Sequence, residues 1–168
     1  ESYILDVPTK ELARVVRSGR LTASSDFSRL TDQDIIIICV PTPIKRRYTP
    51  DISYIRDAVG TIAEYLKKGA LVVLESTTYP GTTREMIQPI LEAGGRKCGR
   101  DFLLSFSPER IDPGNPDFDV TRIPKVVGGI SPEAGARTAQ LYRTIIRNIH
   151  VVSTAEAAEM TKLLENSF

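Results

Sequence analysis

The sequence predicts an α/β protein with a doubly wound, mainly parallel sheet. Short runs rich in Ile and Val are apolar at consecutive positions, as in strands that are covered on both faces. Segments with helical periodicity alternate with these runs, which is the order of βαβ units. No internal repeat or low-complexity segment interrupts the order, and 168 residues suit a single well-buried core.

Five apolar runs are the predicted strands, at residues 34–40, 70–77, 102–107, 125–130 and 149–153. A weaker strand is predicted near residues 21–24. Helical periodicity follows the first, second, fourth and fifth runs. The third run is followed instead by residues 108–124, a stretch with four prolines and one glycine. Loops of that length in a domain are often functional, and disorder is the alternative.

The first predicted helix has an apolar stripe at i, i+3, i+4 and i+7 spacing, made of Ile52, Ile55, Val59, Ile62, Ala63 and Leu66. Pro50 and Asp51 suit its first turn, and Gly69 suits its end. Residues 82–85, Thr-Thr-Arg-Glu, indicate a capping box that opens a second helix. Pro89 predicts a kink or an early stop in that helix.

Ser131 and Pro132 predict the start of a third helix, with an apolar stripe that includes Ala134, Leu141, Ile145 and Ile146. A fourth helix is predicted to start near Thr154 and to continue to Phe168. Its apolar side consists of Ala157, Met160, Leu163, Leu164 and Phe168.

Composition narrows the class of protein. Apolar residues make up 41% of the chain and charged residues 26%, as in soluble globular proteins. A net charge of +1 argues against a surface that binds nucleic acid, which would require a marked excess of basic residues. The longest apolar stretch, residues 35–40, is too short to span a bilayer, and the first residues do not resemble a signal peptide. Cys39 and Cys98 have no partners at metal-ligand spacing, so we expect a cytoplasmic protein without a disulfide framework or metal.

Polar groups follow three of the predicted strands, at residues 41–43, 76–78 and 107–110. Ligands of open α/β sheets bind at the carboxyl edge of the strands, where these segments converge. Their hydroxyls, one carboxylate and one guanidinium suit a polar ligand with phosphates or sugar hydroxyls.

Each group also has a structural explanation. Thr and Ser after a strand commonly cap a helix or close a turn. Glu109 and Arg110 are explained equally well as a solvated ion pair. The basic run at residues 45–47 is interpreted as solvated, and His150 as a structural strand residue. Gly128 and Gly129 lack the spacing of a dinucleotide fingerprint.

Lys162 and Asn166 lie four residues apart, on the polar side of the last predicted helix. One interpretation is a surface lysine flanked by Glu159 and Glu165. The other is a lysine and asparagine pair that faces a ligand. The spacing of these residues in the sequence is compatible with both interpretations.

Six motifs occur together in one order: CVPTP (39–43), PDISY (50–54), LVVLESTTYPGTT (71–83), FSPERIDPGN (106–115), PKVVGG (124–129) and AAEMTKLLENSF (157–168). Over essentially the whole chain they resemble the UDP-glucose/GDP-mannose dehydrogenase family, in particular its UDP-N-acetylhexosamine 6-dehydrogenases of surface-polysaccharide synthesis. The resemblance implies a Rossmann-like NAD-binding domain at residues 1–153, lacking its first βαβ unit and so incomplete at the N-terminus. Residues 154–168 would begin a long central dimerisation helix.

The family oxidises the C6 alcohol of a nucleotide sugar to a carboxylate in two hydride transfers to NAD. A cysteine in a later part of the chain captures the intermediate aldehyde as a thiohemiacetal, and the resulting thioester is hydrolysed. The resemblance implies an NAD cofactor, a UDP-N-acetylhexosamine substrate and a homodimer or higher homo-oligomer. Composition and cysteine spacing, in turn, predict no metal, nucleic-acid or membrane partner.

The resemblance also assigns roles to residues. Thr42 and Thr77 match positions that contact the dinucleotide. Glu109 matches the acid/base that activates the hydrolytic water. Lys162 matches the catalytic lysine that stabilises negative charge on the sugar oxygen, and Asn166 matches its companion; both also contact the substrate. This role is chemically consistent, because a fixed cation stabilises the negative charge that develops on the C6 oxygen as it becomes an alkoxide.

Arg110 and Ile111 match substrate-contacting positions of the hexosamine branch. The chain lacks the Gly-rich first turn, the acidic residue for the adenosine ribose and the nucleophilic cysteine, since neither Cys39 nor Cys98 lies in the required motif. By itself it is therefore expected to be inactive. UDP-glucose dehydrogenases carry a second acid where this chain has Pro113, which favours an N-acetylhexosamine over glucose.

Three alternatives stay open. The first is a UDP-glucose 6-dehydrogenase, and the second is a β-hydroxyacid dehydrogenase, against which the SPERIDPGN and STTYPGTT segments argue. The third is a non-catalytic α/β ligand-binding module. A G-x-G-x-x-G turn upstream and a cysteine motif downstream would exclude the third.

Overall fold

The computed structural model describes residues 2, 7–44, 50–110 and 123–165. One sheet has the order β1-β2-β3-β4-β5, with strands β1 (Ile35–Ile38), β2 (Ala70–Leu74), β3 (Phe102–Phe106), β4 (Lys125–Gly129) and β5 (Ile149–Val152). All five predicted strands are present. The weaker strand predicted at residues 21–24 is wrong, because that segment has no ladder partner in the described part of the chain.

The sheet is parallel from β1 to β3 and changes direction at β4. Phe106 of β3 pairs with Gly128 in antiparallel register, whereas Val126 of β4 pairs with His150 of β5 in parallel register. The predicted mainly parallel sheet is confirmed: only the β3–β4 pair is antiparallel, so β4 and β5 run opposite to β1, β2 and β3. No helical pattern separates the third and fourth apolar runs, and parallel neighbours require a crossover connection. The first residue of β4 therefore lies at the carboxyl edge of β1 to β3.

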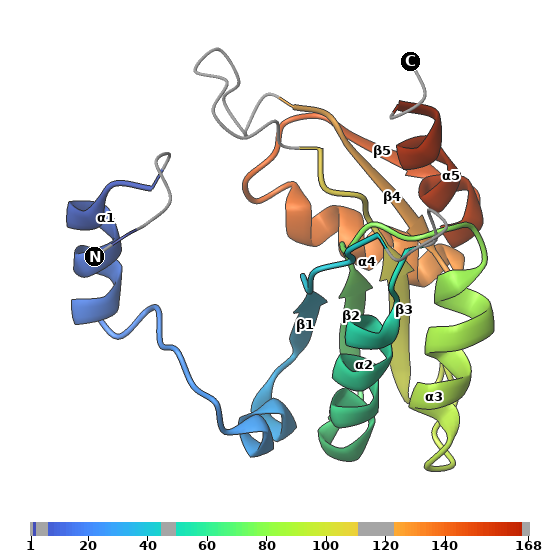
Figure 1. Cartoon of the computed structure of the whole chain (residues 1–168), viewed down its shortest axis with the longest axis horizontal. Coiled ribbons are helices and arrows are strands. Elements are labelled where there is room, and N and C mark those ends of the chain that lie inside the picture. The colour runs from blue at the N-terminus through green and yellow to red at the C-terminus, as the bar shows by residue number, and fades with distance from the viewer. Residues whose placement is uncertain (1, 3–6, 45–49, 111–122, 166–168) are drawn as a thin grey trace.

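Helices cover both faces of the sheet (Figure 1). On one face lie α2 (Ser53–Tyr65), the π-helical turn η2 (Thr82–Ile87), α3 (Gln88–Glu92) and α5 (Ala155–Glu165). On the other face lies α4 (Pro132–Tyr142). Pro89 falls in the first turn of α3, so the predicted break occurs where the π-helical turn gives way to α3. Within the described ranges, no helix is long and apolar enough to cross a membrane.

Alternation along β2 divides the core between the two faces. Val72 and Leu74 join the larger cluster, with Ile55, Val59, Ile62, Ile87, Leu91, Leu104 and Phe106. Leu71 and Val73 join the smaller one, with Val127, Tyr142 and Ile146. The prediction that both faces of every strand are covered is wrong for β1, where Ile35 and Ile37 are each 42% exposed. The helix of the second face, α4, packs on β2 to β5.

The third helix buries part of its predicted stripe, with Ala134 buried and Leu141 half-buried, and the fourth helix exposes most of its predicted apolar side. α4 ends at Tyr142, so Ile145 lies beyond it and is exposed, while Ile146 is buried. Ser131 does cap α4, since its Oγ accepts a hydrogen bond from the Ala134 N–H at 3.2 Å. On α5 the apolar side chains Met160, Leu163 and Leu164 are exposed, and the buried residues are Ala155, Ala158 and Glu159.

The start of α5 lies directly against β4. A Cβ added to Gly128 would be 2.1 Å from the carbonyl oxygen of Thr154 and 2.9 Å from the Cβ of Ala158. Only glycine permits this approach. Gly128 therefore allows the start of α5 to pack directly against β4.

A buried carboxylate fixes α5 to the turn after β2. Glu159 is fully buried, and its carboxylate accepts hydrogen bonds from the Gly81 N–H at 2.6 Å, the Thr83 N–H at 2.8 Å and the Thr83 hydroxyl at 2.6 Å. We call this arrangement the Glu159 clamp. It satisfies backbone donors at the start of η2 that have no intrahelical partner. The capping box predicted at residues 82–85 is wrong, because a carboxylate from α5 takes its place.

An ion pair lies beside the clamp. Arg84 Nε is 2.5 Å from Glu156 Oε1, one turn before Glu159 on α5. Both side chains are partly exposed, so this pair adds less to stability than the buried contacts.

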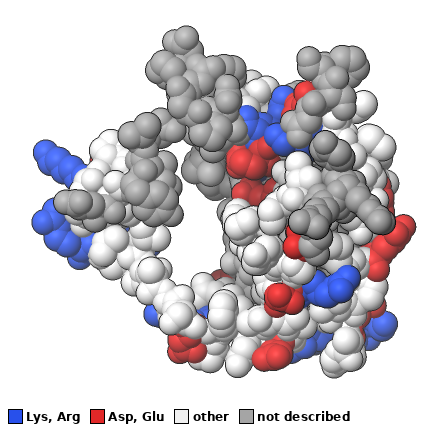
Figure 2. Space-filling model, viewed as in Figure 1, with Lys and Arg blue, Asp and Glu red and all other residues white. Residues whose placement is uncertain are grey.

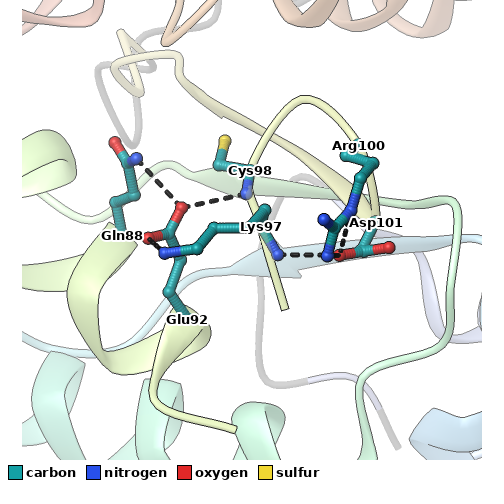
Figure 3. Close-up of polar contacts among 6 residues, drawn as sticks. All are labelled: Gln88, Glu92, Lys97, Cys98, Arg100 and Asp101. Atoms are coloured by element: carbon teal, nitrogen blue, oxygen red, sulfur yellow. Dashed lines mark hydrogen bonds and ion pairs between the residues drawn. The ribbon is translucent and has the colours of Figure 1, made fainter. Parts of the chain in front are cut away.

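Hydrogen bonds and ion pairs hold the polar loop between α3 and β3 (Figure 3). Glu92 accepts hydrogen bonds from the Cys98 N–H at 3.0 Å and from Gln88 at 3.2 Å, and it pairs with Lys97 at 3.2 Å. Asp101 accepts from the Lys97 N–H at 2.8 Å. These contacts give Cys98 a structural setting away from the carboxyl edge.

Two elements have no counterpart in the sequence prediction. They are α1 (Thr9–Arg17) and the 3₁₀ turn η1 (Phe27–Asp32). α1 stands apart from the sheet and carries basic side chains (Figures 1 and 2). It has no buried residue in the described structure, so tertiary packing gives no support to it there.

Replacing Gly128 by Ala is expected to lower the free energy of unfolding by about 3 kcal/mol, because the new methyl group overlaps the Thr154 carbonyl. Gly60→Ala is the matched control. It lies within α2 with open space around it, so this change is expected to stabilise by about 0.5–1 kcal/mol. Urea unfolding followed by circular dichroism measures both. Equal effects of the two changes would contradict the close approach of α5.

Glu159→Gln is expected to destabilise by about 3 kcal/mol, because an amide N–H₂ cannot accept from the buried donors that it faces. The control is Glu156→Gln, which weakens only the partly exposed pair with Arg84 and should cost at most about 1 kcal/mol. Thermal unfolding of the two variants gives the comparison. Similar midpoints would show that the clamp contributes little.

Candidate functional site

The ends of four strands bring their polar residues to one edge of the sheet. Cys39 and Thr42 follow β1, Glu75 and Thr77 follow β2, Glu109 follows β3, and Lys125 begins β4. Acidic and basic side chains gather at the upper end of the sheet in Figure 2. The convergence predicted from the sequence is thus present, with β4 added to it.

Several hydroxyls of this edge have structural roles. The Ser76 hydroxyl accepts from the Val40 N–H at 2.8 Å and donates to the Ile38 carbonyl at 3.3 Å, which ties the ends of β1 and β2 together. Ser107 donates to the Val126 carbonyl at 2.8 Å. Thr78 and Thr82 form a buried pair at 2.6 Å. The turn-closing explanation therefore fits the Thr78 and Thr82 pair, whereas Ser76 and Ser107 bond to neighbouring strands instead.

Thr42 and Thr77 differ from these hydroxyls. Thr42 is half-buried and Thr77 is exposed. Within the described ranges, neither hydroxyl is hydrogen-bonded to another protein group. Both remain available to a ligand at the carboxyl edge, and their chemistry fits the hydroxyl and phosphate groups of a dinucleotide.

A buried ion pair lies beneath the same edge. Lys125 Nζ is 2.8 Å from Glu75 Oε1, and these side chains are only 7% and 12% exposed. The Tyr142 hydroxyl of α4 donates to the same carboxylate oxygen. The ammonium group also lies over the Tyr142 ring, 4.7 Å from its centre. The lysine is thereby held between a carboxylate and an aromatic face.

The neighbours of this pair have shifted pKa values. Burial opposes ionisation of Glu75, but the hydrogen bonds from Lys125 and Tyr142 leave its pKa below the ordinary value. Desolvation, followed by the Glu75 carboxylate, raises the pKa of Cys39 to about 12. Burial and Glu75 likewise raise the pKa of Tyr142. At neutral pH Glu75 is therefore a carboxylate, while the Cys39 thiol and the Tyr142 phenol are neutral.

Glu109 and Arg110 do not form a solvated pair with each other's side chains. The Glu109 carboxylate accepts from the Arg110 backbone N–H at 2.7 Å and lies 3.6 Å from Lys125 Nζ. The Arg110 guanidinium donates to the Pro124 carbonyl at 2.7 Å and pairs with Glu165 of α5. Their partners on β4 and α5 make the solvated-pair explanation wrong.

The contact between Arg110 and Glu165 brings the segment after β3 against the last turn of α5, three residues from Lys162. Lys162 itself is half-buried. The flanking-charge explanation for Lys162 is wrong in one respect, because Glu159 is buried in the clamp and is not a surface neighbour. Asn166, Ile111, Pro113 and residues 45–47 lie outside the described residues, and their assignments stay predictions.

A small cavity opens beside the acid, lined by Pro108, Glu109, Arg110, Ile123, Pro124, Lys125 and Ile146. It has one carboxylate, two cations and apolar walls. His150 is exposed on β5 and is not among the residues that line this cavity. Among the described residues, no group of three or more His, Cys, Asp and Glu is arranged to hold a metal ion.

Sequence reasoning missed Glu75, Lys125 and Tyr142. Glu75 carried a signal, since a carboxylate directly after an apolar strand lies in the predicted edge segment. Lys125 carried a weaker one, because a lysine within an apolar run is rarely buried unless it is paired. Tyr142 carried none, because its role depends on how α4 packs on the sheet.

The thiol of Cys39 is expected to react about 10²-fold more slowly than an ordinary thiol with a disulfide reagent at pH 8, because few thiolates form at a pKa of about 12. A Cys98→Ser background isolates its signal. Glu75→Gln should speed the reaction by removing the adjacent carboxylate, whereas Asp34→Asn, which alters a remote exposed carboxylate, should not. An ordinary rate in the parent would contradict this electrostatic setting.

Comparisons with known proteins bear on this arrangement. Residues 2–146 match the family model described as "UDP-glucose/GDP-mannose dehydrogenase family, NAD binding domain". The UDP-N-acetyl-D-mannosamine dehydrogenase of Pyrococcus horikoshii is 35% identical over 95% of this chain. The UDP-N-acetyl-D-glucosamine 6-dehydrogenase of Pseudomonas aeruginosa is 36% identical over 94% of it. The chain spans 38% of the length of each of these relatives.

Solved structures agree. The UDP-D-ManNAc dehydrogenase structure from Pyrococcus horikoshii matches with a TM-score of 0.88 and 37% identity, over 95% of this chain and 38% of that one. A ternary complex of GDP-mannose dehydrogenase from Pseudomonas aeruginosa matches with a TM-score of 0.88 and 29% identity, over 99% and 40%. These matches confirm the resemblance, the Rossmann-like fold and the NAD cofactor predicted from the motifs. The chain belongs to the UDP-glucose/GDP-mannose dehydrogenase family, in which it corresponds to the NAD-binding domain.

Proposed function

We propose that this chain is part of an NAD-dependent nucleotide-sugar 6-dehydrogenase, which oxidises the C6 alcohol of a UDP-N-acetylhexosamine to the uronate. The observation that carries the proposal is the contact between Arg110 and Glu165, which joins the acid-bearing segment after β3 to the helix turn near Lys162. Because the chain spans 38% of its relatives, the activity is proposed for the intact protein, in which this chain is joined to the segments that the relatives carry beyond it.

In this proposal Thr42 and Thr77 bind the dinucleotide at the ends of β1 and β2. NAD, when bound, supplies the hydride acceptor. Lys162 and Asn166 contact the sugar oxygen, where the lysine ammonium stabilises the negative charge that develops as the C6 hydroxyl loses its proton. Glu109 acts as the acid/base for the hydrolytic water. It lies at a cavity, is half exposed and has a cation beside it, which suits a group that exchanges protons.

The proposed substrate rests on relatives and on one motif. Two relatives at 35% and 36% identity are named for UDP-N-acetyl-D-mannosamine and UDP-N-acetyl-D-glucosamine. Arg110 and Ile111 are the proposed contacts to the hexosamine. By the same likeness we place the activity in surface-polysaccharide synthesis in the cytoplasm, with residues 1–153 as the NAD-binding domain.

A homodimer or higher homo-oligomer is part of the proposal. Met160, Leu163 and Leu164 form an exposed apolar side on α5. Exposed apolar side chains that recur along one helix are suited to pairing with another surface. Residues 154–168 are proposed to begin the helix that provides it.

The test is NADH formation by the intact protein with UDP-N-acetylmannosamine, UDP-N-acetylglucosamine and UDP-glucose in parallel. We expect NADH at 340 nm with an N-acetylhexosamine and little with glucose. Activity on a small β-hydroxyacid and none on these sugars would support the alternative dehydrogenase class. Absence of NADH with every UDP-sugar would overturn the proposal.

Lys162→Ala in the intact protein is expected to lower turnover by a factor on the order of 10³ or more, with little change in the unfolding temperature, because a half-buried lysine carries little packing. Lys68→Ala, at an exposed lysine after α2, is the matched control and should leave turnover unchanged. Steady-state kinetics and thermal unfolding of both variants give the comparison. Near-normal turnover of the Lys162 variant would mean that its amine is a solvated surface group.

A further inference from the structure

Lys162 lies on α5 midway between two contacts that hold this helix to other parts of the chain. Three residues before it, Glu159 binds the turn after β2 through the Glu159 clamp. Three residues after it, Glu165 pairs with Arg110 in the segment after β3. Residues three apart are neighbours on a helix surface, with an axial rise of about 4.5 Å between them. The position of Lys162 is therefore set by contacts within about one turn on either side.

We propose that Glu159 is a positioning residue for Lys162: by joining α5 to the turn after β2, it sets the place of the lysine amine relative to the dinucleotide that Thr77 contacts. This inference rests on the proposed function, in which Thr77 binds NAD and Lys162 contacts the sugar oxygen. It adds a residue that acts on the position of the catalytic amine through the helix that carries both.

Of the two contacts, the clamp is the more rigid. The Glu159 side chain is fully buried, and both of its carboxylate oxygens accept hydrogen bonds. Two of the three donors are the backbone N–H groups of Gly81 and Thr83, which cannot move unless the turn itself moves. The side chains of Arg110 and Glu165, in contrast, are 27% and 31% exposed, and such pairs hold their partners less firmly. The clamp therefore determines how α5 lies against the turn.

The turn held by the clamp is the one that carries Thr77. Hydrogen bonds close this turn internally: the hydroxyls of Thr78 and Thr82 form a buried pair at 2.6 Å, and the Thr82 hydroxyl donates to the Tyr79 carbonyl at 2.7 Å. The turn therefore moves as one piece with the residue that follows it, Thr83. Attachment of this piece to α5 fixes where the dinucleotide contact lies relative to that helix.

The chemical step depends steeply on the position of the amine. A cation stabilises a developing alkoxide only if it is already aimed at that oxygen, and a misplacement of about 1 Å can cost on the order of 10²-fold in rate. Loosening the clamp in a folded protein should therefore slow hydride transfer from the sugar more than it weakens the binding of NAD.

The test uses Thr83→Val in the intact protein, because this change removes one donor to Glu159 and nearly keeps the volume of a fully buried side chain. Glu159→Gln is the stronger variant, and Thr83→Ser, which retains the hydroxyl, is the conservative one. Thr138→Val is the matched control. Thr138 is equally buried, and its hydroxyl donates to the Ala134 carbonyl at 2.9 Å within α4, on the other face of the sheet.

The rate of the first hydride transfer is measured in a single turnover, from NADH at 340 nm. The substrate is UDP-N-acetylmannosamine or UDP-N-acetylglucosamine, whichever the parent oxidises, at saturating NAD. The temperature is kept well below the unfolding midpoint of every variant. The Kd of NAD and the midpoint are measured alongside.

We expect Thr83→Val to slow the first hydride transfer about 10-fold and Glu159→Gln about 10²-fold. The Kd of NAD should change less than about threefold, since the lost interaction acts on the chemical step. Thr83→Ser should keep the parent rate, and Thr138→Val should keep it despite a lowered unfolding midpoint. A merely structural role would lower the midpoints of both valine variants and leave both rates unchanged. The parent rate in Thr83→Val, or an equal loss of rate in Thr138→Val, would overturn the inference.

Amide hydrogen exchange separates this inference from the proposed function. In the intact parent, binding of NAD should slow exchange along α5 by about threefold or more, because the clamp passes the stabilisation of the turn to the helix. Thr83→Val should lose this protection, and Thr138→Val should keep it. If no UDP-sugar yields NADH, the proposed function fails, and the exchange still decides whether Glu159 couples the turn to α5. Protection that is absent from the parent, or equal in all three proteins, contradicts the role of Glu159.

Discussion

The structure depends on the burial of one carboxylate. Glu159 reaches from α5 into the turn after β2 and accepts three hydrogen bonds from Gly81 and Thr83. A carboxylate without such donors would be costly to bury, and the turn without the carboxylate would leave donors unsatisfied. Each element thus requires the other. Together with the close approach at Gly128, the Glu159 clamp places α5 against both the turn and the sheet, and Lys162 and Glu165 are carried on that helix.

A change of strand direction decides the electrostatics of the edge. Because β4 runs antiparallel to β3, its first residue arrives where β1, β2 and β3 end. Lys125 thereby adds a cation to an edge that carries the Cys39 thiol and the carboxylates of Glu75 and Glu109. The ammonium group compensates the buried Glu75 and leaves Glu109 accessible. A sheet with β4 parallel to β3 would have placed this lysine at the far edge.

The hydroxyl groups of the edge divide into two kinds. Ser76, Ser107 and Thr78 are buried and hydrogen-bonded to neighbouring strands or turns, so they hold the strand ends in register. Thr42 and Thr77 are more accessible and have no such partners in the described structure. At the consecutive residues Ser76, Thr77 and Thr78, side chains of the same chemistry thus either serve the scaffold or remain available to a ligand. Alternation of side chains along an extended segment accounts for the difference.

The sequence alone determined the order of strands and helices, the carboxyl edge that collects Thr42, Thr77 and Glu109, and the family, because periodicity and motifs are local properties of the chain. Only the tertiary structure decided the direction of β4, the burial of Glu159 in place of the predicted capping box, and the exposure of Met160 and Leu164. These features depend on which surfaces meet across long separations in sequence. Lys125 shows most clearly what sequence patterns do not predict. It is far from Glu75 and Tyr142 in sequence, and the three side chains meet only because β2, β4 and α4 pack together.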